Sequence, residues 1–206
     1  MTRLVSIPGI IPVNSYLHID PETQTGFLID PGADAPRLLH LIEQQHWTIE
    51  AILLTHGHFD HIGAVAEISE RLGIPYYIHR NGEAYLADPS LNLSAYSGVP
   101  IVLHGAQYLD DGDIIRLKAN PEWALQVIHT PGHTPDSVVY YHPSERTAFV
   151  GDTIFSHGSY GATHFPGGNA QQLFDSIRKR ILTLPPDTRL LSGHSEPFQC
   201  SEWGSY

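Results

Sequence analysis

Four side chains that commonly bind metal ions lie within six positions of the chain. The segment Thr55–His61 has the sequence THGHFDH, which contains His56, His58, Asp60 and His61. Imidazole nitrogen and carboxylate oxygen suit Zn²⁺, and such a site needs no cysteine. A solvated histidine-rich loop is the alternative, but the pattern His-x-His-x-Asp-His directly after an apolar run favours a metal site.

Three further candidates each follow a predicted strand and a glycine. They are His133 after the strand at 124–129, Asp152 after the strand at 147–150, and His194 after the strand at 188–191. A glycine lets the backbone turn sharply, so we expect each side chain to point across the strand ends. One Gly-His pair alone is more often a simple turn. Together with the first cluster, the chain offers five histidines and two aspartates on four loops, which fits two metal ions that share a carboxylate.

The apolar run Ala51–Leu54 precedes the first cluster. It is short, aliphatic and followed by Gly57, which predicts a buried strand that stops at a turn. Apolar residues then recur at helical spacing from Ile62 to Leu72 and end at Gly73, which predicts a helix. The metal-binding candidates therefore lie on a strand-to-helix loop, where side chains can converge.

The remaining elements surround this loop. An antiparallel meander is predicted over 4–7, 14–19 and 26–30, and helices over 36–46 and from Asn169 to about Leu184. Further strands are predicted at 75–78, at 114–117 after a hairpin-like turn at 109–114, and at 137–142, whereas 79–98 shows only a weak signal. No linker or repeat separates these elements, so we expect one domain over residues 1–206. Strand clusters interrupted by helices predict two sheets with helices packed outside them.

The composition limits the possible functions. The 206 residues include 11 basic and 22 acidic side chains, a net charge of −11, which argues against binding to nucleic acid. No apolar run reaches the roughly 20 residues of a membrane span, and the N-terminus lacks the apolar segment of a signal peptide. The single cysteine, Cys200, excludes an internal disulfide and fits a reducing compartment, so we expect a cytoplasmic protein without membrane contact. Cys200 lies in a polar tail, and we expect no chemical role for it.

The ordered motifs THGHFDH at 55–61, TPGHT at 130–134, GDT at 151–153 and GH at 193–194 resemble those of the metallo-β-lactamase fold superfamily. The resemblance covers nearly the whole chain. Residues 88–103 and the FPGGN segment at 165–169 are similar to the glyoxalase II-like hydrolases of that superfamily. The resemblance implies an α/β fold, the αββα sandwich, in which two mixed β-sheets are flanked by helices and the site lies along one edge.

The resemblance also implies a ligand set for two divalent metal ions. His56, His58 and His133 would hold the first ion, Asp60, His61 and His194 the second, and Asp152 would bridge them. Zn²⁺ is the expected metal, Fe and Mn are alternatives that suit the same donors, and no organic cofactor is expected. Asp60 and Asp152 would also take part in catalysis. An aspartate at 152 separates the chain from the β-lactamases that use a thiolate at this position.

The expected activity is hydrolysis of a small acyl thioester or ester, as by a hydroxyacylglutathione hydrolase or another thioesterase. A hydroxide that bridges the two metals would attack the acyl carbonyl. A mononuclear iron persulfide dioxygenase of the same fold is the main alternative, with two histidines and a carboxylate drawn from His133, Asp152 and His194 or similar. A lactonase and a non-catalytic module with structural metal are further alternatives. Seven ligands for two metals leave open positions, which favours catalysis.

The substrate side of the site departs from the glyoxalase II pattern. Relatives commonly have Gly-Arg-Thr-Asp where this chain has Gly161–His164, so that Ala162 replaces an arginine. His157 and His164 flank the Gly158–Thr163 loop and are candidates for contact with the substrate. The chain also ends at Tyr206, so we expect it to lack the helical C-terminal domain that holds glutathione. A glutathione thioester is therefore expected to bind weakly, and the physiological substrate and the oligomeric state stay open.

Two other residues could either support the metal ligands or belong to ordinary structure. Asp30 ends the predicted meander at a turn, and His129 ends a strand that enters the site. The remaining histidines lie in ordinary strand, helix or surface settings and suggest no role: His18, His40, His46, His104 and His142.

Overall fold

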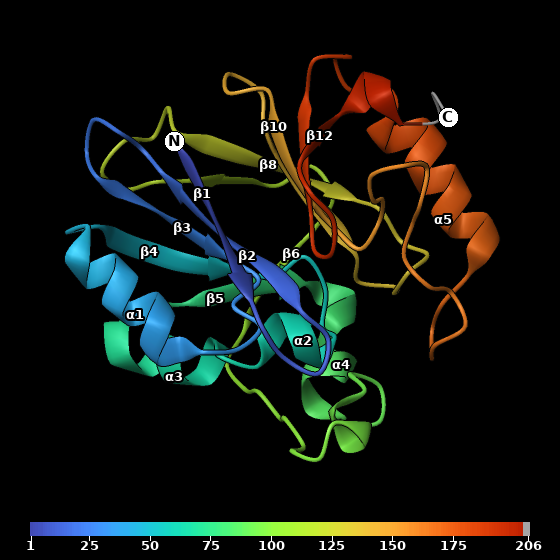
Figure 1. The fold of residues 1–206 in the computed structure, drawn as a ribbon, viewed down its shortest axis with the longest axis horizontal. Coiled ribbons are helices and arrows are strands. Elements are labelled where there is room, and N and C mark those ends of the chain that lie inside the picture. The colour runs from blue at the N-terminus through green and yellow to red at the C-terminus, as the bar shows by residue number, and fades with distance from the viewer. Residues whose placement is uncertain (204–206) are drawn as a thin grey trace.

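The computed structural model describes residues 1–203, which form two six-stranded β-sheets with helices on both outer sides (Figure 1). The first sheet contains six strands in sequence order: β1 (Thr2–Ile7), β2 (Val13–Ile19), β3 (Thr25–Ile29), β4 (Thr48–Leu53), β5 (Tyr76–His79) and β6 (Gln107–Leu109). β1, β2 and β3 pair as the predicted antiparallel meander, whereas β3 to β6 run parallel to one another. The sheet is therefore mixed, as expected.

The second sheet has the order β12-β11-β10-β9-β8-β7. Its strands are β7 (Ile114–Arg116), β8 (Ala124–His129), β9 (Val138–His142), β10 (Thr147–Gly151), β11 (Arg189–Ser192) and β12 (Phe198–Gln199). Neighbouring strands are antiparallel except for β10 and β11, which are parallel. A parallel pair needs a long crossover connection, and a helix supplies it here.

Helices cover the outer faces of both sheets. α1 (Ala35–Gln44) and α3 (Val65–Leu72) lie on the first sheet, and α5 (Ala170–Ser176), continued by the π-helical turn Ile177–Ile181, lies on the second (Figure 1). Shorter helices are α2 (Phe59–Ile62), α4 (Glu83–Ala87) and 3-10 turns at Arg80–Gly82, Ser94–Tyr96 and Cys200–Glu202. Over residues 1–203, no helix is both long and apolar enough to cross a membrane.

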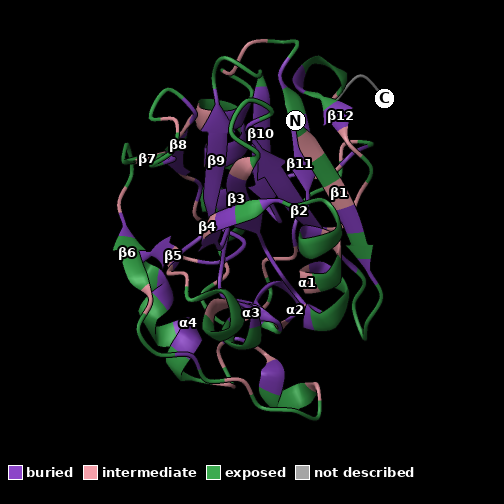
Figure 2. Cartoon of the chain, turned by 90° about the vertical axis from the view of Figure 1, so that its left-hand side faces the viewer, coloured by how far each residue is buried: buried purple, intermediate pink, exposed green. Residues whose placement is uncertain are grey.

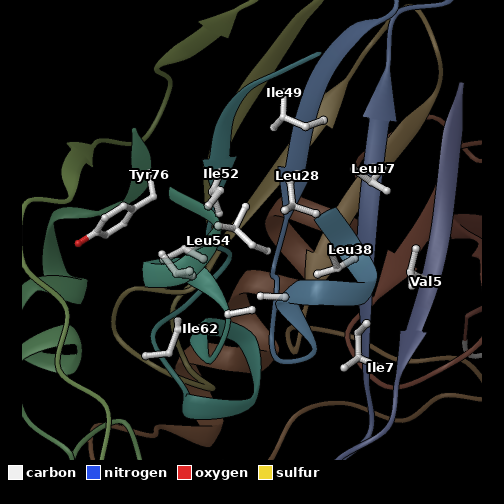
Figure 3. Close-up of a cluster of buried hydrophobic side chains, with 14 of the residues drawn as sticks. Val5, Ile7, Leu17, Leu28, Leu38, Ile49, Ile52, Leu54, Ile62 and Tyr76 are labelled. Atoms are coloured by element: carbon white, nitrogen blue, oxygen red, sulfur yellow. The ribbon is translucent and has the colours of Figure 1, made fainter. Parts of the chain in front are cut away.

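Three clusters of buried side chains fill the spaces between these four layers. The first joins the first sheet to α1 and α3 and includes Leu17, Leu28, Leu38 and Ile52 (Figure 3). Ile68 of α3 also belongs to it. The second lies between the sheets and includes Phe27, Leu53, Val127, Tyr140 and Phe149. The third joins the second sheet to α5 and includes Val139, Ala148, Leu173, Ile177 and Leu190. The arrangement confirms the predicted αββα sandwich.

The apolar runs in the sequence follow from burial of the strands on both faces. In β4, Ile52 faces the helices while its neighbour Leu53 faces the other sheet. Every residue of β9 and β10 is buried, and the central strands are buried along most of their length (Figure 2). Strands covered on both sides are continuously apolar rather than alternating, which is the pattern that identified these segments.

The helix predicted from Ile62 to Leu72 is divided into α2 and α3. The two helices are separated by Gly63 and Ala64, where the chain passes close to the turn that follows β3. Ala64 N donates to the Pro31 carbonyl at 2.9 Å, and a Cβ on Gly63 would lie 2.2 Å from the Gly32 carbonyl oxygen. This contact between distant segments bends the backbone, so local periodicity could not show it.

Two further expectations about local structure were wrong. The segment 109–114 is not a hairpin turn, because β6 and β7 belong to different sheets and the chain crosses between them here. Cys200 does not lie in an exposed tail: it is buried in the cluster under α5, and its thiol donates to the Ile181 carbonyl at 3.4 Å. Burial raises the pKa of the Cys200 thiol, which agrees with the absence of a chemical role.

Two histidines expected in ordinary settings form a buried pair. His18 Nε2 and His142 Nδ1 are 2.7 Å apart, and both residues are almost fully buried. The pair is extended at its ends by Thr2 Oγ1, 2.9 Å from His18 Nδ1, and by Ser144 Oγ, 3.0 Å from His142 Nε2. The polar ring atoms are thus satisfied inside the protein, as buried polar groups require.

Candidate metal centre

The seven candidate ligands meet where strands of both sheets end. One cluster follows β4 of the first sheet, and the other three residues follow β8, β10 and β11 of the second. Their ligand atoms form three overlapping groups, and within each group all atoms lie within 4.8 Å of one another. The groups are His56, His58 and His133; His56, His61 and Asp152; and Asp60, His61 and His194. The first and third groups coincide with the two ligand sets that the resemblance implies.

The first group consists of three imidazoles whose nitrogens face one point. His58 Nδ1 lies 3.2 Å from His56 Nε2 and 3.0 Å from His133 Nε2. The three rings are nearly perpendicular to one another, with interplanar angles of 81°, 81° and 87°. Three converging imidazole nitrogens are a ligand set that Zn²⁺ accepts.

Asp152 lies between the first and third groups. Its Oδ1 is 3.4 Å from His61 Nε2, and its Oδ2 is 3.6 Å from His133 Nε2 and 3.2 Å from His194 Nε2. Asp60 Oδ2 approaches only the third group, at 3.7 Å from His61 Nε2 and 3.2 Å from His194 Nε2. Asp152 is therefore the carboxylate that reaches histidines of both groups.

Backbone carbonyls orient two of the histidines. His133 Nδ1 donates to the Ala162 carbonyl at 2.6 Å, and His194 Nδ1 donates to the Pro12 carbonyl at 2.7 Å. Because Nδ1 of each ring is occupied as a donor, Nε2 is the nitrogen that faces the centre. We expected Ala162 to affect substrate binding. It contacts the centre through its backbone carbonyl, so this contact does not depend on the identity of its side chain.

Asp30 supports the centre rather than only ending a strand. Its Oδ2 accepts from His61 Nδ1 at 2.9 Å and from Thr55 Oγ1 at 2.6 Å, while Oδ1 accepts from Thr55 N at 2.8 Å. A carboxylate behind a ligating histidine fixes the tautomer and the ring orientation. The alternative of a simple turn is therefore excluded for Asp30.

The residues present fit a metal ion. Six of the seven candidates are buried, and His194 is partly exposed. Buried carboxylates and imidazoles without a cation carry a high desolvation cost. Asp152 Oδ1, which faces the centre, is buried without a hydrogen-bond partner. The donor set, all nitrogen and oxygen, is one that Zn²⁺, Fe and Mn accept.

The charges at the centre favour a bound cation. Burial and the nearby His61 and His133 lower the pKa of His56 well below 6.5, and burial with His133 lowers the pKa of His58 to about 3. Burial alone would raise the pKa of Asp152, yet His61 and His194 hold it well below its usual range. At neutral pH His56 and His58 are therefore neutral and Asp152 is ionised, as metal binding requires. Burial lowers the pKa of His61 and of His194, but Asp152 and the neighbouring carboxylates outweigh it and raise the pKa of His61 well above 6.5 and that of His194 to about 10. These two imidazoles are protonated without a cation, so metal binding there releases protons.

Glycines precede three of the ligands for two different reasons. Gly132 and Gly151 have positive φ angles of 139° and 49°, which confirms the predicted sharp turns before His133 and Asp152. Gly193 has no such angle. A Cβ there would lie 2.4 Å from Asp152 Oδ1 and 2.7 Å from His61 Cε1, so this glycine is required for close approach to the centre.

The other histidines considered from sequence lie further out. His157 is exposed on the surface, where its Nε2 lies 2.8 Å from Glu196 Oε1. His164 is exposed and packs on Phe165, whose ring centroid is 5.9 Å from that of His58. His129 stacks on His79 at 4.0 Å and donates from Nε2 to the Pro135 carbonyl at 2.9 Å, which gives it a packing role.

Several residues near the centre had no sequence signal. The Tyr85 ring lies 6.0 Å from that of His58, and its hydroxyl donates to the Pro166 carbonyl at 2.5 Å. Asp136 is fully buried behind Gly57, and burial raises its pKa to about 6. Both lie on segments without a motif, so only the folded chain shows that they pack against the metal-binding loop.

The chain belongs to the metallo-β-lactamase superfamily, whose family model matches residues 8–194. It is 40% identical over 187 residues to the probable metallo-hydrolase YqgX of Bacillus subtilis, covering 90% of this chain and 86% of that one. It is 30% identical over 192 residues to the hydroxyacylglutathione hydrolase GloC of Haemophilus influenzae, covering 90% and 89%. The family predicted from the motifs is thus confirmed.

Solved structures show the same fold. The BLEG-1 B3 metallo-β-lactamase superposes with a TM-score of 0.91 at 36% identity, covering 98% of this chain and 95% of that one. TTHA1623 in a di-iron-bound form superposes with a TM-score of 0.83 at 36% identity, covering 97% of this chain and 95% of that one. ETHE1 from Myxococcus xanthus superposes with a TM-score of 0.78 at 28% identity, covering 98% of this chain and 80% of that one. Together with the donor groups, these findings make the chain a metallo-hydrolase-superfamily protein with a candidate metal site.

Proposed function

We propose that this protein is a metal-dependent hydrolase of small acyl thioesters or esters, with two divalent ions held by the seven His and Asp residues. The observation that carries the proposal is the position of Asp152, whose two oxygens face histidines of two separate ligand groups. A shared carboxylate offsets the repulsion between two dications. The likeness to GloC, named a hydroxyacylglutathione hydrolase, supports the thioester class.

The protein's own residues prepare the reaction. Ions held here would supply Lewis acidity toward a carbonyl oxygen and water activated for nucleophilic attack. Asp152 and Asp60 are ionised at neutral pH, because the nearby His61 and His194 outweigh burial and lower both pKa values. In this ionised form both carboxylates would hold the ions, Asp60 within the group of His61 and His194 and Asp152 between the two groups. Asp30 and the Ala162 and Pro12 carbonyls keep the imidazoles in the required orientation.

Zn²⁺ is the metal that we propose first. An all nitrogen-and-oxygen site accepts zinc, iron or manganese, and the di-iron form of TTHA1623 supports iron as an alternative. Metal analysis of protein purified without added metal should give about two ions per chain.

Substitution of Asp152 tests the bridging role. Asp152→Ala should lower the metal content and reduce hydrolysis by more than about 100-fold, the upper range for changes that only support a ligand. Asp175→Ala is the matched control, because Asp175 is partly exposed on α5 and pairs only with Lys179 at 3.2 Å. An Asp152→Ala protein with full metal content and full activity would refute the proposal.

A mononuclear iron dioxygenase is the second candidate. Two of the observed groups contain two histidines and one carboxylate, which is the donor set of non-haem iron oxygenases. They are His56, His61 and Asp152, and Asp60, His61 and His194, rather than the set of His133, Asp152 and His194 considered from sequence. A single tightly held iron, with oxygen uptake in the presence of glutathione persulfide, would establish this alternative. A panel that includes lactones and a β-lactam would separate the hydrolase classes.

The setting of this activity is also a proposal. The chain is proposed to act as one domain in the cytoplasm on small molecules, without nucleic acid or membrane partners. The net charge of −11 and the single buried cysteine support this. Fractionation of cells that express a tagged protein would test the location.

A further inference from the structure

An apolar cavity of about 490 Å³ opens beside the metal centre. Its wall comes from four separate segments, and the main lining residues are Ile10, Ile11, Phe59, Leu93, Tyr96 and Phe165. A second cavity of about 410 Å³ shares Ile10, Ile11 and Phe59 and extends to Asp60. We call the first cavity the apolar pocket. The pocket lies next to the candidate metal ligands, because the ring centroid of its lining residue Phe165 is 5.9 Å from that of His58 and Phe59 lies between His58 and Asp60 in sequence.

The wall of the apolar pocket is held in place by specific contacts. Phe59 N donates to the Asn92 carbonyl at 2.8 Å, which attaches the loop before Leu93 to the metal-binding segment. Asn92 is fully buried, and its Nδ2 donates to the carbonyls of Tyr85 and Ile101 at 2.8 and 3.0 Å. The loop that carries Leu93 and Tyr96 is therefore built against the site.

Large apolar side chains at the rim remain in contact with solvent. Ile10 is 73% exposed, Ile11 43% and Tyr96 79%. Burial of such side chains against an apolar group is favourable, so exposed apolar patches commonly mark binding sites. Because these side chains lie at the mouth of a cavity next to the candidate metal ligands, we infer that the substrate occupies the cavity.

The pocket contains no cationic group. All eleven Lys and Arg residues lie among residues 1–203, and none of them lines either cavity. Several are paired elsewhere, as Arg80 is with Asp110 and Arg146 with Asp187. The charged residues that line the second cavity are acidic: Asp34, Asp60 and Glu67. A carboxylate-bearing group such as the glutathionyl moiety would find no charge-assisted partner here.

We propose that the apolar pocket binds an uncharged aliphatic or aromatic part of the substrate, so that the preferred substrates are neutral esters or thioesters rather than glutathione conjugates. This inference rests on the proposed function and specifies its substrate class. The pocket provides uniform binding, which changes KM rather than the chemical step.

Two substrate series test the inference on the metal-loaded protein. In 4-nitrophenyl acetate, butanoate and hexanoate the leaving group is constant, and kcat/KM should rise about two- to fourfold for each added methylene. Lactoyl thioesters of glutathione and of N-acetylcysteamine share the acyl group, and the neutral one should have a KM at least about tenfold lower. A flat chain-length series together with saturation by micromolar S-lactoylglutathione would overturn the inference.

Variants at the rim of the apolar pocket test whether the dependence of kcat/KM on chain length arises there. Ile10→Lys and Tyr96→Lys change exposed side chains and should lower kcat/KM for the hexanoate ester about tenfold while the acetate ester changes little. Ile114→Lys is the matched control, because Ile114 is 53% exposed on β7 and lines neither cavity. If the rim variants leave kinetics unchanged and instead convert a dimer to a monomer, the pocket is an interface and the inference is wrong.

A binding measurement separates this inference from the proposed function. Calorimetry with the non-hydrolysable amides N-methylbutanamide and N-methylhexanamide, which carry the chain on the acyl side as the esters do, should show tighter binding of the longer amide, and loss of that difference in Tyr96→Lys. Amide binding of this kind without hydrolysis of any ester or thioester would leave the pocket established and refute the hydrolase. Hydrolysis without chain-length dependence in either assay would refute the pocket alone.

Discussion

Asp30 is the residue whose replacement tests how the centre is built. Asp30 has a positive φ of 48°, a conformation that Asn tolerates, so Asp30→Asn changes the chemistry without straining the backbone. The carboxylate accepts three hydrogen bonds, two from Thr55 and one from His61. An amide offers only one oxygen, and its NH₂ group would face at least one of these donors.

The expected loss of metal affinity follows from these three hydrogen bonds. If the amide NH₂ faces His61 Nδ1, the imidazole must place its proton on Nε2, which then can no longer bind a metal ion. Loss of a hydrogen bond to a charged acceptor costs about 1.5–3 kcal/mol, and changes behind a ligand typically lower metal affinity about 10- to 100-fold. We expect Asp30→Asn to fall in this range while the histidines themselves remain unchanged.

Chelator competition with a zinc indicator measures this affinity, and kcat/KM for an ester provides the second readout. Asp34→Asn is the matched control, because Asp34 is an exposed N-cap residue of α1 whose carboxylate accepts from Arg37 N at 3.3 Å. An Asp30→Asn protein that binds both ions with unchanged affinity would show that the carboxylate does not set the tautomer of His61.

Two further predictions concern stability and close packing. Burial lowers the pKa of His18 well below 6.5 and also lowers that of His142, so the unfolded chain takes up protons that the folded one excludes, and stability is lost as pH falls below about 6.5. Urea titrations from pH 7.5 to 4.5 should show that the free energy of unfolding falls more steeply with decreasing pH in the wild type than in the His18→Asn/His142→Asn variant. The difference in slope should be about 1.4 kcal/mol per pH unit for each histidine that is neutral only in the folded protein, and about 2.7 kcal/mol per pH unit while both are; equal slopes would contradict the assignment. Gly193→Ala should reduce metal content and activity at least about tenfold, since its Cβ would meet Asp152 Oδ1 at 2.4 Å. Normal metal content by elemental analysis in that variant would show that the loop can move aside.

The strands and the candidate ligands were predictable because both depend on local patterns. Ala51–Leu54 is apolar at every position since the strand is covered on both faces, and the ligand motifs sit at the strand ends. The contacts that orient the ligands were less predictable from the sequence. The carbonyls of Pro12 and Ala162 orient His194 and His133 through the backbone, which any residue type can provide.

Other features depend on contacts between distant parts of the chain. The break between α2 and α3 arises where Gly63 meets Gly32, and the burial of Cys200 arises from the cluster under α5. His18 and His142 are separated by 124 positions, so nothing in either neighbourhood indicates that they pair. Sequence patterns reveal local periodicity, whereas these features depend on contacts that form only when distant segments pack together in the folded protein.

The loop that carries His194 is held by the beginning of the chain. Asn14 N donates to the Gly193 carbonyl at 2.8 Å, its side chain donates to the Ser195 carbonyl at 2.9 Å, and the Tyr16 hydroxyl donates to the Ser192 carbonyl at 2.6 Å. During synthesis on the ribosome, the histidines of the first ligand group emerge by residue 133, but His194 emerges last. A nascent chain can therefore complete the second ligand group only after its C-terminal strand has returned to the N-terminal hairpin.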